Sequence, residues 1–94
     1  MAVKVIIPTP LRPYAGKQES VEMEAGNVRE ALKGLTTRFG ELKKHLYSDD
    51  GRLRSFVNVY VNDEDIRYLE KEETQLRDGD IVSIVPSIAG GTGK

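Results

Sequence analysis

The sequence predicts one small α+β domain, and three observations support this fold class. The chain has 94 residues, a length that allows one hydrophobic core but not two. Alternating apolar residues predict strands near both ends of the chain and in its middle. Residues 28–39 instead space their apolar residues as one face of a helix, and one amphipathic helix covers only one face of a sheet.

Two strands are expected before the helix. Residues 2–8 alternate, and residues 20–25 alternate again with glutamates on the exposed face, which predicts a hairpin. The segment 9–17 between them contains two prolines and a glycine, so it is expected to be a loop. The inward face of the first strand is formed by Val3, Val5 and Ile7.

The helix is expected to start after Asn27, because an Asn side chain accepts a hydrogen bond from an unpaired amide of the first turn. Glu30, three residues later, completes a pattern close to a capping box. Gly34 costs up to about 1 kcal/mol relative to alanine inside a helix, so it indicates close packing on the sheet. Gly40 is expected to end the helix. Its apolar stripe consists of Val28, Ala31, Leu32, Leu35 and Phe39.

The segments that join the later strands are less regular. Leu42 and Leu46 fit a short helical turn, and a turn is expected at Asp50-Gly51. Residues 67–76 are expected to be mostly loop, with a short strand or turn. Residues 77–80, with the sequence RDGD, predict a tight turn.

Two later strands complete the predicted sheet. Residues 56–61 show the clearest strand pattern, which NDED ends, and residues 81–86 form the last strand, ending at Pro86. A hairpin, a helix and later strands fit a ubiquitin-like β-grasp, a mixed sheet with one main helix packed on one face, although other small α+β folds share this order. We therefore predict a β-grasp domain over residues 1–86 and an extended C-terminal tail over residues 87–94.

The composition excludes several classes of function. Its 14 basic and 15 acidic residues give a net charge of −1, so the chain lacks the basic field that nucleic-acid binding requires. It has no cysteine, which excludes disulfides, thiolate metal sites and a catalytic thiol. No apolar run approaches the roughly 18 residues of a membrane span, and no export signal is visible, so a cytoplasmic domain is expected.

No group of residues has the pattern of an active site. His45 is the only histidine, so a nucleophilic triad cannot be assembled in the usual way, and no role is assigned to it. Asp63, Glu64 and Asp65 are close enough for carboxylate chemistry or cation binding, but such a cluster after a strand is more often a solvated turn, and its spacing matches no calcium loop. We expect no catalytic residues and no metal site, and the protein is predicted not to be an enzyme.

The C-terminal residues AGGTGK leave two interpretations open. A phosphate-binding loop is excluded, because Ile88 stands where its first glycine is required and no Ser or Thr follows Lys94. The tail is then either a frayed end or a tether that carries a carboxylate into a partner's active site. Ser87 to Gly91 spans roughly 16–18 Å when extended, and glycines fit a narrow channel because they lack Cβ.

Apolar residues on the sheet face opposite the helix predict a binding surface for a partner. The alternative is that the loop 63–78 folds over this face and buries it. Arg12, in the proline-bounded loop, is a candidate polar anchor for the partner or simply an exposed side chain. The predicted docking face consists of Ile6, Phe56, Tyr60 and Val85.

Three segments together resemble a known family, namely IIPTPLRPYAG, FVNVYVNDEDI and LRDGDIVSIVPSIAGG. They are similar to the MoaD/ThiS group of ubiquitin-like sulfur carriers, and in particular to the CysO-type carriers of cysteine biosynthesis. The likeness extends from Val3 to Gly91. Its specific part is VNDEDI combined with the DGD turn, the last strand and the double glycine, whereas the double glycine alone would be weak.

The resemblance implies a carrier whose reactive terminus is the carboxylate of Gly91, with Ala89 and Gly90 as its thin approach. An adenylating enzyme of the ubiquitin-activating type would activate that carboxylate with ATP, and a sulfur donor would replace AMP to give a thiocarboxylate. In CysO-like systems the acceptor is an activated serine derivative on a PLP-dependent synthase. The resemblance therefore implies no cofactor in the carrier itself.

The chain departs from the family pattern at its end. Mature members end at the second glycine, whereas here Thr92, Gly93 and Lys94 follow, so a peptide bond occupies the Gly91 carbonyl. The resemblance suggests that a JAMM-type metalloprotease cuts between Gly91 and Thr92; the alternatives are an inactive carrier and an artificial extension. Two other functions stay open, a ubiquitin-like modifier joined to lysines through Gly91 and a plain interaction module. So do acceptor pathways other than cysteine synthesis.

Overall fold

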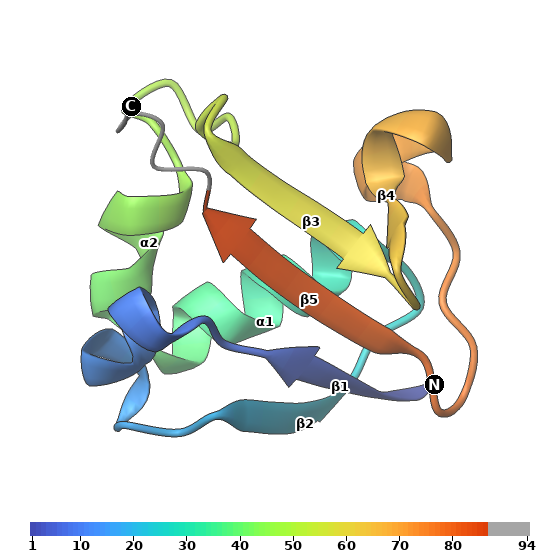
Figure 1. Ribbon diagram of the computed structural model, residues 1–94, viewed down its shortest axis with the longest axis horizontal. Coiled ribbons are helices and arrows are strands. Elements are labelled where there is room, and N and C mark those ends of the chain that lie inside the picture. The colour runs from blue at the N-terminus through green and yellow to red at the C-terminus, as the bar shows by residue number, and fades with distance from the viewer. Residues whose placement is uncertain (87–94) are drawn as a thin grey trace.

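The computed structural model describes residues 1–86, which form a mixed five-stranded sheet (Figure 1). The strands are β1 (Ala2–Ile6), β2 (Ser20–Glu24), β3 (Val57–Val61), β4 (Glu64–Asp65) and β5 (Ile81–Pro86). They lie in the order β2-β1-β5-β3-β4, in which β1 and β5 are parallel and the other neighbours are antiparallel. The predicted hairpin of β1 and β2 and the predicted β-grasp fold are both confirmed.

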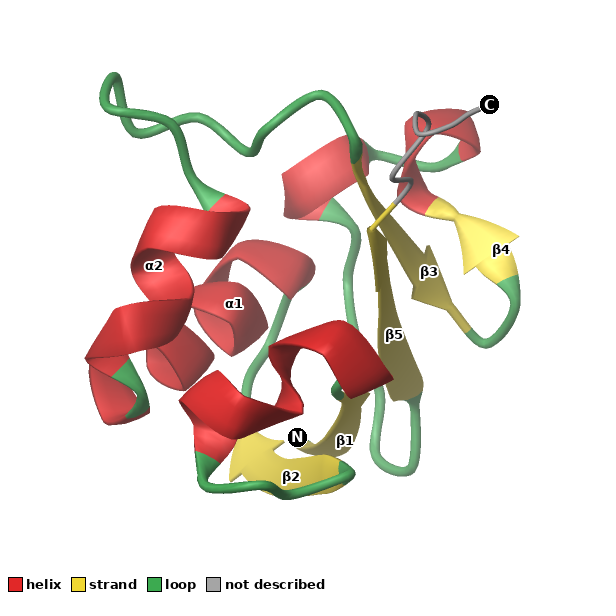
Figure 2. Cartoon of the chain, turned by 60° about the vertical axis from the view of Figure 1, so that its left-hand side comes forward, coloured by secondary structure: helices red, strands yellow, loops and turns green. Residues whose placement is uncertain are grey.

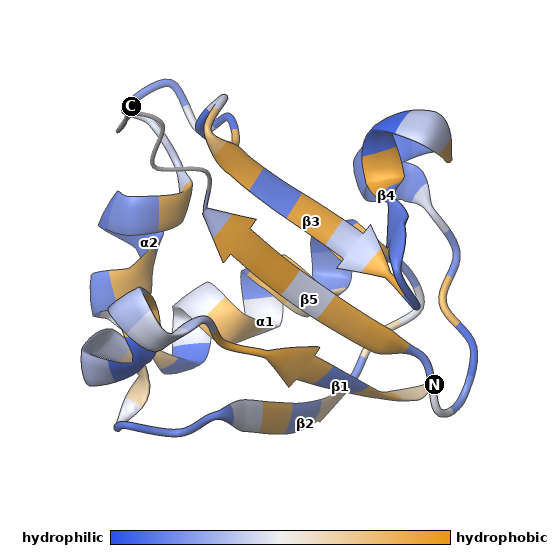
Figure 3. Ribbon diagram, in the orientation of Figure 1, coloured by the Kyte–Doolittle hydropathy of each residue, from blue (hydrophilic) through white to orange (hydrophobic). Residues whose placement is uncertain are grey.

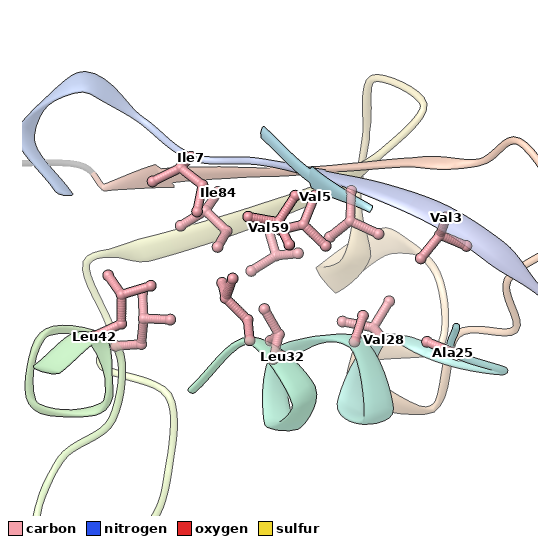
Figure 4. Close-up of a cluster of buried hydrophobic side chains, with 14 of the residues drawn as sticks. Val3, Val5, Ile7, Ala25, Val28, Leu32, Leu42, Val59 and Ile84 are labelled. Carbon is pink, nitrogen blue, oxygen red and sulfur yellow. The ribbon is translucent and has the colours of Figure 1, made fainter. Parts of the chain in front are cut away.

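Two α-helices, α1 (Val28–Arg38) and α2 (Gly40–Leu46), lie on one side of the sheet (Figure 2). The apolar stripe of α1 is fully buried except for Phe39, which is half-buried beyond the end of the helix. Figure 4 shows Val28 and Leu32 facing inward-pointing side chains of the strands, among them Val5 and Val59. None of the helices within residues 1–86 is long and apolar enough to cross a membrane.

The start of α1 follows the predicted capping chemistry. The Asn27 side chain accepts a hydrogen bond from the Glu30 amide at 2.8 Å, while Glu30 Oε1 accepts one from the Gly26 amide at 2.8 Å. A Cβ on Gly34 would lie 3.4 Å from the Met23 sulfur on β2, which confirms the expected close approach to the sheet. Two backbone amides of the first turn are thus satisfied by side chains.

The end of α1 differs from the prediction. The helix stops at Arg38, and Gly40 is the first residue of α2 rather than a terminal glycine in the left-handed conformation. Leu42 and Leu46 anchor α2, because both side chains are fully buried in the core. The short helical turn predicted from these two leucines is therefore confirmed, and it follows α1 with a single residue between them.

The segment predicted as a loop after β1 is a 3₁₀ helix, η1 (Thr9–Ala15). Proline at its start has a φ angle that suits helical geometry, and Leu11 and Ala15 are buried four residues apart. Gly16 ends it with φ +63°, a left-handed conformation that glycine adopts at low cost. The two prolines and the glycine that predicted a loop therefore start, interrupt and end this helix.

The segment NDED ends β3 as predicted, but it also contains the short strand expected further along. Asn62 and Asp63 have φ angles of +49° and +76°, which form a two-residue turn, and β4 pairs back with Tyr60 and Val61. Two short 3₁₀ helices follow, η2 (Ile66–Tyr68) and η3 (Lys71–Glu73), and η3 contacts α1. The predicted RDGD turn is present before β5.

Candidate interaction surface at the root of the C-terminal tail

The tail starts from the middle of the sheet, because β5 lies between β1 and β3 and ends at Pro86. Figure 1 shows the last residues of β5 close to α2 and to the segment before β3. The predicted tail and processing residues lie outside the described part of the chain, so their roles stay predictions. These residues are Ala89, Gly90, Gly91 and Thr92.

Three of the four residues predicted for the docking face lie together on the outer side of the sheet. Ile6 of β1 and Tyr60 of β3 both pair with Ser83 of β5, so these side chains form one row across three strands. Val85 lies two residues further along β5 and is 44% exposed. Figure 3 shows that β5 is hydrophobic along most of its length, as expected of a strand that is apolar on both faces.

The loop 63–78 does not cover this outer face. Val85 is 44% exposed and Ile81 is 40% exposed, although both belong to the central strand of the sheet. The 3₁₀ helices of that segment contact α1 and β3 instead. An apolar strip therefore remains accessible on the side of the sheet that the helices leave free.

Phe56 does not belong to that row, because β3 starts at Val57 and Phe56 lies in the turn before it. Its side chain is 45% exposed and lines a groove of about 390 Å³ beside the end of β5. Pro10 and Leu11 of η1 form part of the groove wall. We name this feature the tail-root groove; its other lining residues are Tyr14, Lys44, His45, Arg54 and Pro86.

The lining of the tail-root groove is mainly apolar and includes basic side chains. The Tyr14 and His45 rings stack with centroids 4.1 Å apart and an angle of 26° between their planes. Arg54 Nε donates a hydrogen bond to the Lys44 carbonyl at 3.0 Å, which fixes the guanidinium against α2. No carboxylate lines the groove within residues 1–86.

Arg12 is half-buried rather than fully exposed. Its Nε donates a hydrogen bond to the Ile7 carbonyl at 3.0 Å, so the side chain joins η1 to the end of β1. This hydrogen bond does not test the predicted role of Arg12 as a polar anchor for a partner, which stays a prediction. The structure shows a stabilising role for Arg12 within its own domain, which the sequence did not indicate.

The acidic cluster after β3 is part of the scaffold. Asp63 belongs to the two-residue turn, and the buried Asp65 side chain accepts hydrogen bonds from the Arg67 amide at 2.9 Å and from Arg67 Nη2 at 2.7 Å. The hydrogen-bonded Arg67 side chain holds the pKa of the Asp65 carboxyl below its usual value. These contacts favour the structural reading of this cluster over a cation site.

The amino-terminal end of β5 is closed by hydrogen bonds. The Asn62 side chain accepts from the Ile81 amide at 3.0 Å and donates to Asp80 at 2.8 Å. Asp80 also accepts from the Arg77 amide at 2.8 Å, and Asp78 accepts from the Ala2 amide at 2.8 Å. This set of contacts joins the turn before β5 to β1 and to the β3–β4 turn.

Comparisons with known proteins agree with this geometry. A sequence model described as the ThiS family matches residues 5–91. The chain belongs to the ThiS family. It is 41% identical over 93 residues to the sulfur carrier protein CysO of Mycobacterium tuberculosis, and the match covers 97% of this chain and 100% of that protein.

Two solved structures extend the ThiS-family likeness to the fold. A chain in the crystal structure of the Amycolatopsis orientalis BexX/CysO complex has a TM-score of 0.84 at 40% identity, covering 95% of this chain and 99% of that one. The small archaeal modifier protein SAMP1 from Methanosarcina acetivorans has a TM-score of 0.85 at 30% identity, covering 96% of each chain. Both confirm the ubiquitin-like β-grasp fold.

Sequence reasoning missed the tail-root groove, because its residues come from four separate segments. Tyr14 and His45 are far apart in the chain, and neither carries a pattern that predicts their stacking. The one available signal was the position of Phe56 directly before an alternating strand, at the end that pairs with Pro86. We interpreted that phenylalanine as part of the outer face.

Proposed function

We propose that this protein is a sulfur carrier that delivers sulfide as a thiocarboxylate on Gly91. The observation that carries the proposal is the ThiS-family match, which runs to Gly91, the second glycine of the pair. The central strand ends at Pro86, five residues earlier, so an extended tail of that length reaches roughly 16–18 Å from the fold. Near full-length similarity to CysO supports cysteine synthesis as the pathway served.

The first step is maturation of the tail. Hydrolysis of the Gly91–Thr92 peptide bond adds one water molecule, leaves a carboxylate on Gly91 and releases the tripeptide Thr92 to Lys94. A JAMM-type metalloprotease is the proposed catalyst. Before this cut, the Gly91 carbonyl belongs to an amide and has no free oxygen that can attack ATP.

The second step is activation, followed by sulfur transfer. A carboxylate oxygen of Gly91 attacks the α-phosphorus of ATP on a ubiquitin-activating-type enzyme, and pyrophosphate leaves. Hydrosulfide supplied by a sulfur donor then attacks the acyl carbon, the bond from that carbon to AMP breaks and AMP leaves, and loss of the S–H proton gives the thiocarboxylate. Adenylation is needed because a bare carboxylate resists nucleophiles, whereas AMP is a good leaving group.

In this proposal the chain is a co-substrate and has no active site of its own. Its described residues position the tail, and the reactive groups come from ATP and from partner enzymes, with a PLP-dependent cysteine synthase as the acceptor enzyme. The match to a chain of the Amycolatopsis orientalis BexX/CysO complex supports docking of a second folded protein on a carrier of this shape.

Three versions of the protein test the proposal: the full chain, a chain that ends at Gly91, and a chain that ends at Gly90. Each is incubated with the adenylating enzyme of the same organism, ATP and a sulfur donor. We expect ATP–pyrophosphate exchange and an oxygen-to-sulfur mass gain only for the chain that ends at Gly91. Equal activation of the full chain would contradict the processing step, and inactivity of the Gly91 chain would contradict the function.

A second candidate function is conjugation to lysines of target proteins through Gly91. The similarity to SAMP1, a small archaeal modifier protein, supports it, because the same acyl adenylate serves both outcomes. Mass spectrometry of lysates from the native host separates the two. Gly-Gly remnants on lysines of other proteins would favour conjugation, and free carrier with a terminal thiocarboxylate would favour sulfur delivery.

A further inference from the structure

We propose that the tail-root groove docks an acidic, partly apolar surface of the enzyme that adenylates Gly91. The inference rests on the proposed function and adds the partner chemistry that the family match and the double glycine leave open. It assigns a binding role to Lys44 and Arg54, two residues to which the sequence pattern assigns no function.

The chemistry of the groove selects an acidic partner. Aromatic and proline side chains line it together with Lys44 and Arg54, and no carboxylate is among the lining residues within residues 1–86. Within residues 1–86, Lys44 pairs with Glu41, whose Oε1 is 3.9 Å from Nζ on an exposed part of α2. A pair this long and this exposed contributes little, so Lys44 is available to a partner.

The groove is also preorganised. The hydrogen bond from Arg54 Nε to the Lys44 carbonyl fixes one cation, and the Tyr14–His45 stack fixes two of the rings. Phe56 is 45% exposed, so it presents a large apolar surface that a partner can bury. Side chains that are already ordered lose less conformational entropy when a complex forms.

The position of the groove favours the enzyme that takes in the tail. Pro86 is both a lining residue of the groove and the last residue of β5. An enzyme that holds Gly91 in its active site therefore lies within roughly 16–18 Å of this groove, the reach of five extended residues. The surface around the entrance to its tail channel is the part that meets the groove.

The charge distribution along β5 adds an orientation to this encounter. Asp78 and Asp80 lie at the opposite end of the strand, whereas Lys44 and Arg54 lie at the tail. An acidic enzyme surface is attracted to the tail end and repelled by the other end. Charges of this kind raise the association rate and select the correct approach.

The test is a double charge reversal in the chain that ends at Gly91, Lys44→Glu with Arg54→Glu. ATP–pyrophosphate exchange with the adenylating enzyme of the same organism gives KM and kcat for the carrier. We expect KM to rise about tenfold or more with kcat unchanged, because the lost contacts act on docking. The KM of the unmodified carrier should also rise with salt concentration, because salt screens the attraction. The difference in KM between the unmodified carrier and the double reversal should therefore shrink at high salt.

The matched control reverses two exposed cations away from the groove, Lys33→Glu with Arg77→Glu, which changes the net charge by the same amount. Its KM should stay within about twofold of the unmodified carrier. The single variant Lys44→Glu retains the hydrogen bond from Arg54 to the carbonyl of residue 44, so a higher KM in this variant does not come from loss of that bond. We expect its KM to rise less than that of the double reversal.

The outcomes separate the inference from the proposed function. If the double reversal has the same KM as the matched control while the unmodified carrier is adenylated, only the inference fails. A lower KM in the double reversal would show that the groove instead retains the carrier's own tail, and this also overturns the inference. Absence of exchange with the unmodified Gly91 chain overturns the proposed function and the inference with it.

Discussion

The two ends of β5 differ in how they are held. At its start, Ile81, the strand is held by hydrogen bonds that link Asn62, Asp80 and β1, and we call this the closed end. At Pro86 it ends beside an open groove with exposed aromatic and basic side chains. The difference indicates that hydrogen bonds at one end of the strand stabilise the fold, whereas the other end, within residues 1–86, has the exposed groove at which we propose that a partner docks. Three predictions test this contrast, beginning with the largest effect.

Removing the Asn62 side chain should destabilise the closed end of β5 most strongly. Asn62→Ala loses the hydrogen bonds to Ile81 and Asp80, and it places alanine at φ +49° in the left-handed region. We expect the free energy of unfolding to fall by about 2–3 kcal/mol, from about 1 kcal/mol per lost bond and about 1 kcal/mol of backbone strain. Urea denaturation followed by circular dichroism measures it.

Two further variants sharpen this result. Asn62→Gly loses the same hydrogen bonds but relieves the backbone strain, so it should cost about 1 kcal/mol less than Asn62→Ala. Phe56→Ala at the open end removes a half-exposed ring and should cost less than about 1 kcal/mol. Equal losses from Asn62→Ala and Phe56→Ala would contradict the contrast between the two ends.

The closed end shows what the sequence could and could not predict. Alternation identified β1, β3 and β5 because each buries one face, and Asn27 identified the start of α1 because its capping bond is local. The hydrogen bonds of Asn62 with Asp80 and Ile81 were not predicted, because they join residues that only the completed sheet brings together.

The open end was harder to predict. Its groove is lined in part by η1, which is a 3₁₀ helix. This segment contains two prolines and a glycine, and that composition predicts a loop, so the helix was not predicted. The outer face was predicted for Ile6, Tyr60 and Val85 because strand alternation fixes the side of a side chain. The position of Phe56 in the groove was not predicted, because Phe56 lies one residue before β3 starts and strand alternation does not determine its side there.

Acid should loosen β4 and the start of η2, which lie next to the closed end, before the open end. The hydrogen-bonded Arg67 side chain lowers the pKa of Asp65 in the folded protein, so Asp65 contributes stability above its unfolded pKa of about 3.9. That contribution is lost as the pH falls below about 4 and through the lower folded pKa. We expect the free energy of unfolding to decrease over this range, as measured by urea titrations between about pH 2 and pH 6.

Asp65→Asn and Arg67→Gln should each reduce this pH dependence, because each removes one partner of the same pair. Hydrogen exchange locates the effect, since the Arg67 amide is bonded to Asp65 and should exchange faster in acid than amides of the β5 residues near Pro86. An unchanged dependence of the unfolding free energy on pH in both variants would show that the Asp65–Arg67 pair does not control the acid sensitivity of this segment.

Removing the tail should have the smallest effect on stability. The buried core of the described residues and the hydrogen bonds at the closed end are all retained in a chain that ends at Ser87, so we expect it to unfold within about 0.5 kcal/mol of the full chain. A chain that ends at Ser83 is the matched comparison, because it also removes Ile84, which is 2% exposed in the core. Loss of such a residue costs at least about 2 kcal/mol. If ending the chain at Ser87 lowers stability as much as ending it at Ser83, the tail stabilises the fold, and its division from the β-grasp domain at residue 86 is wrong.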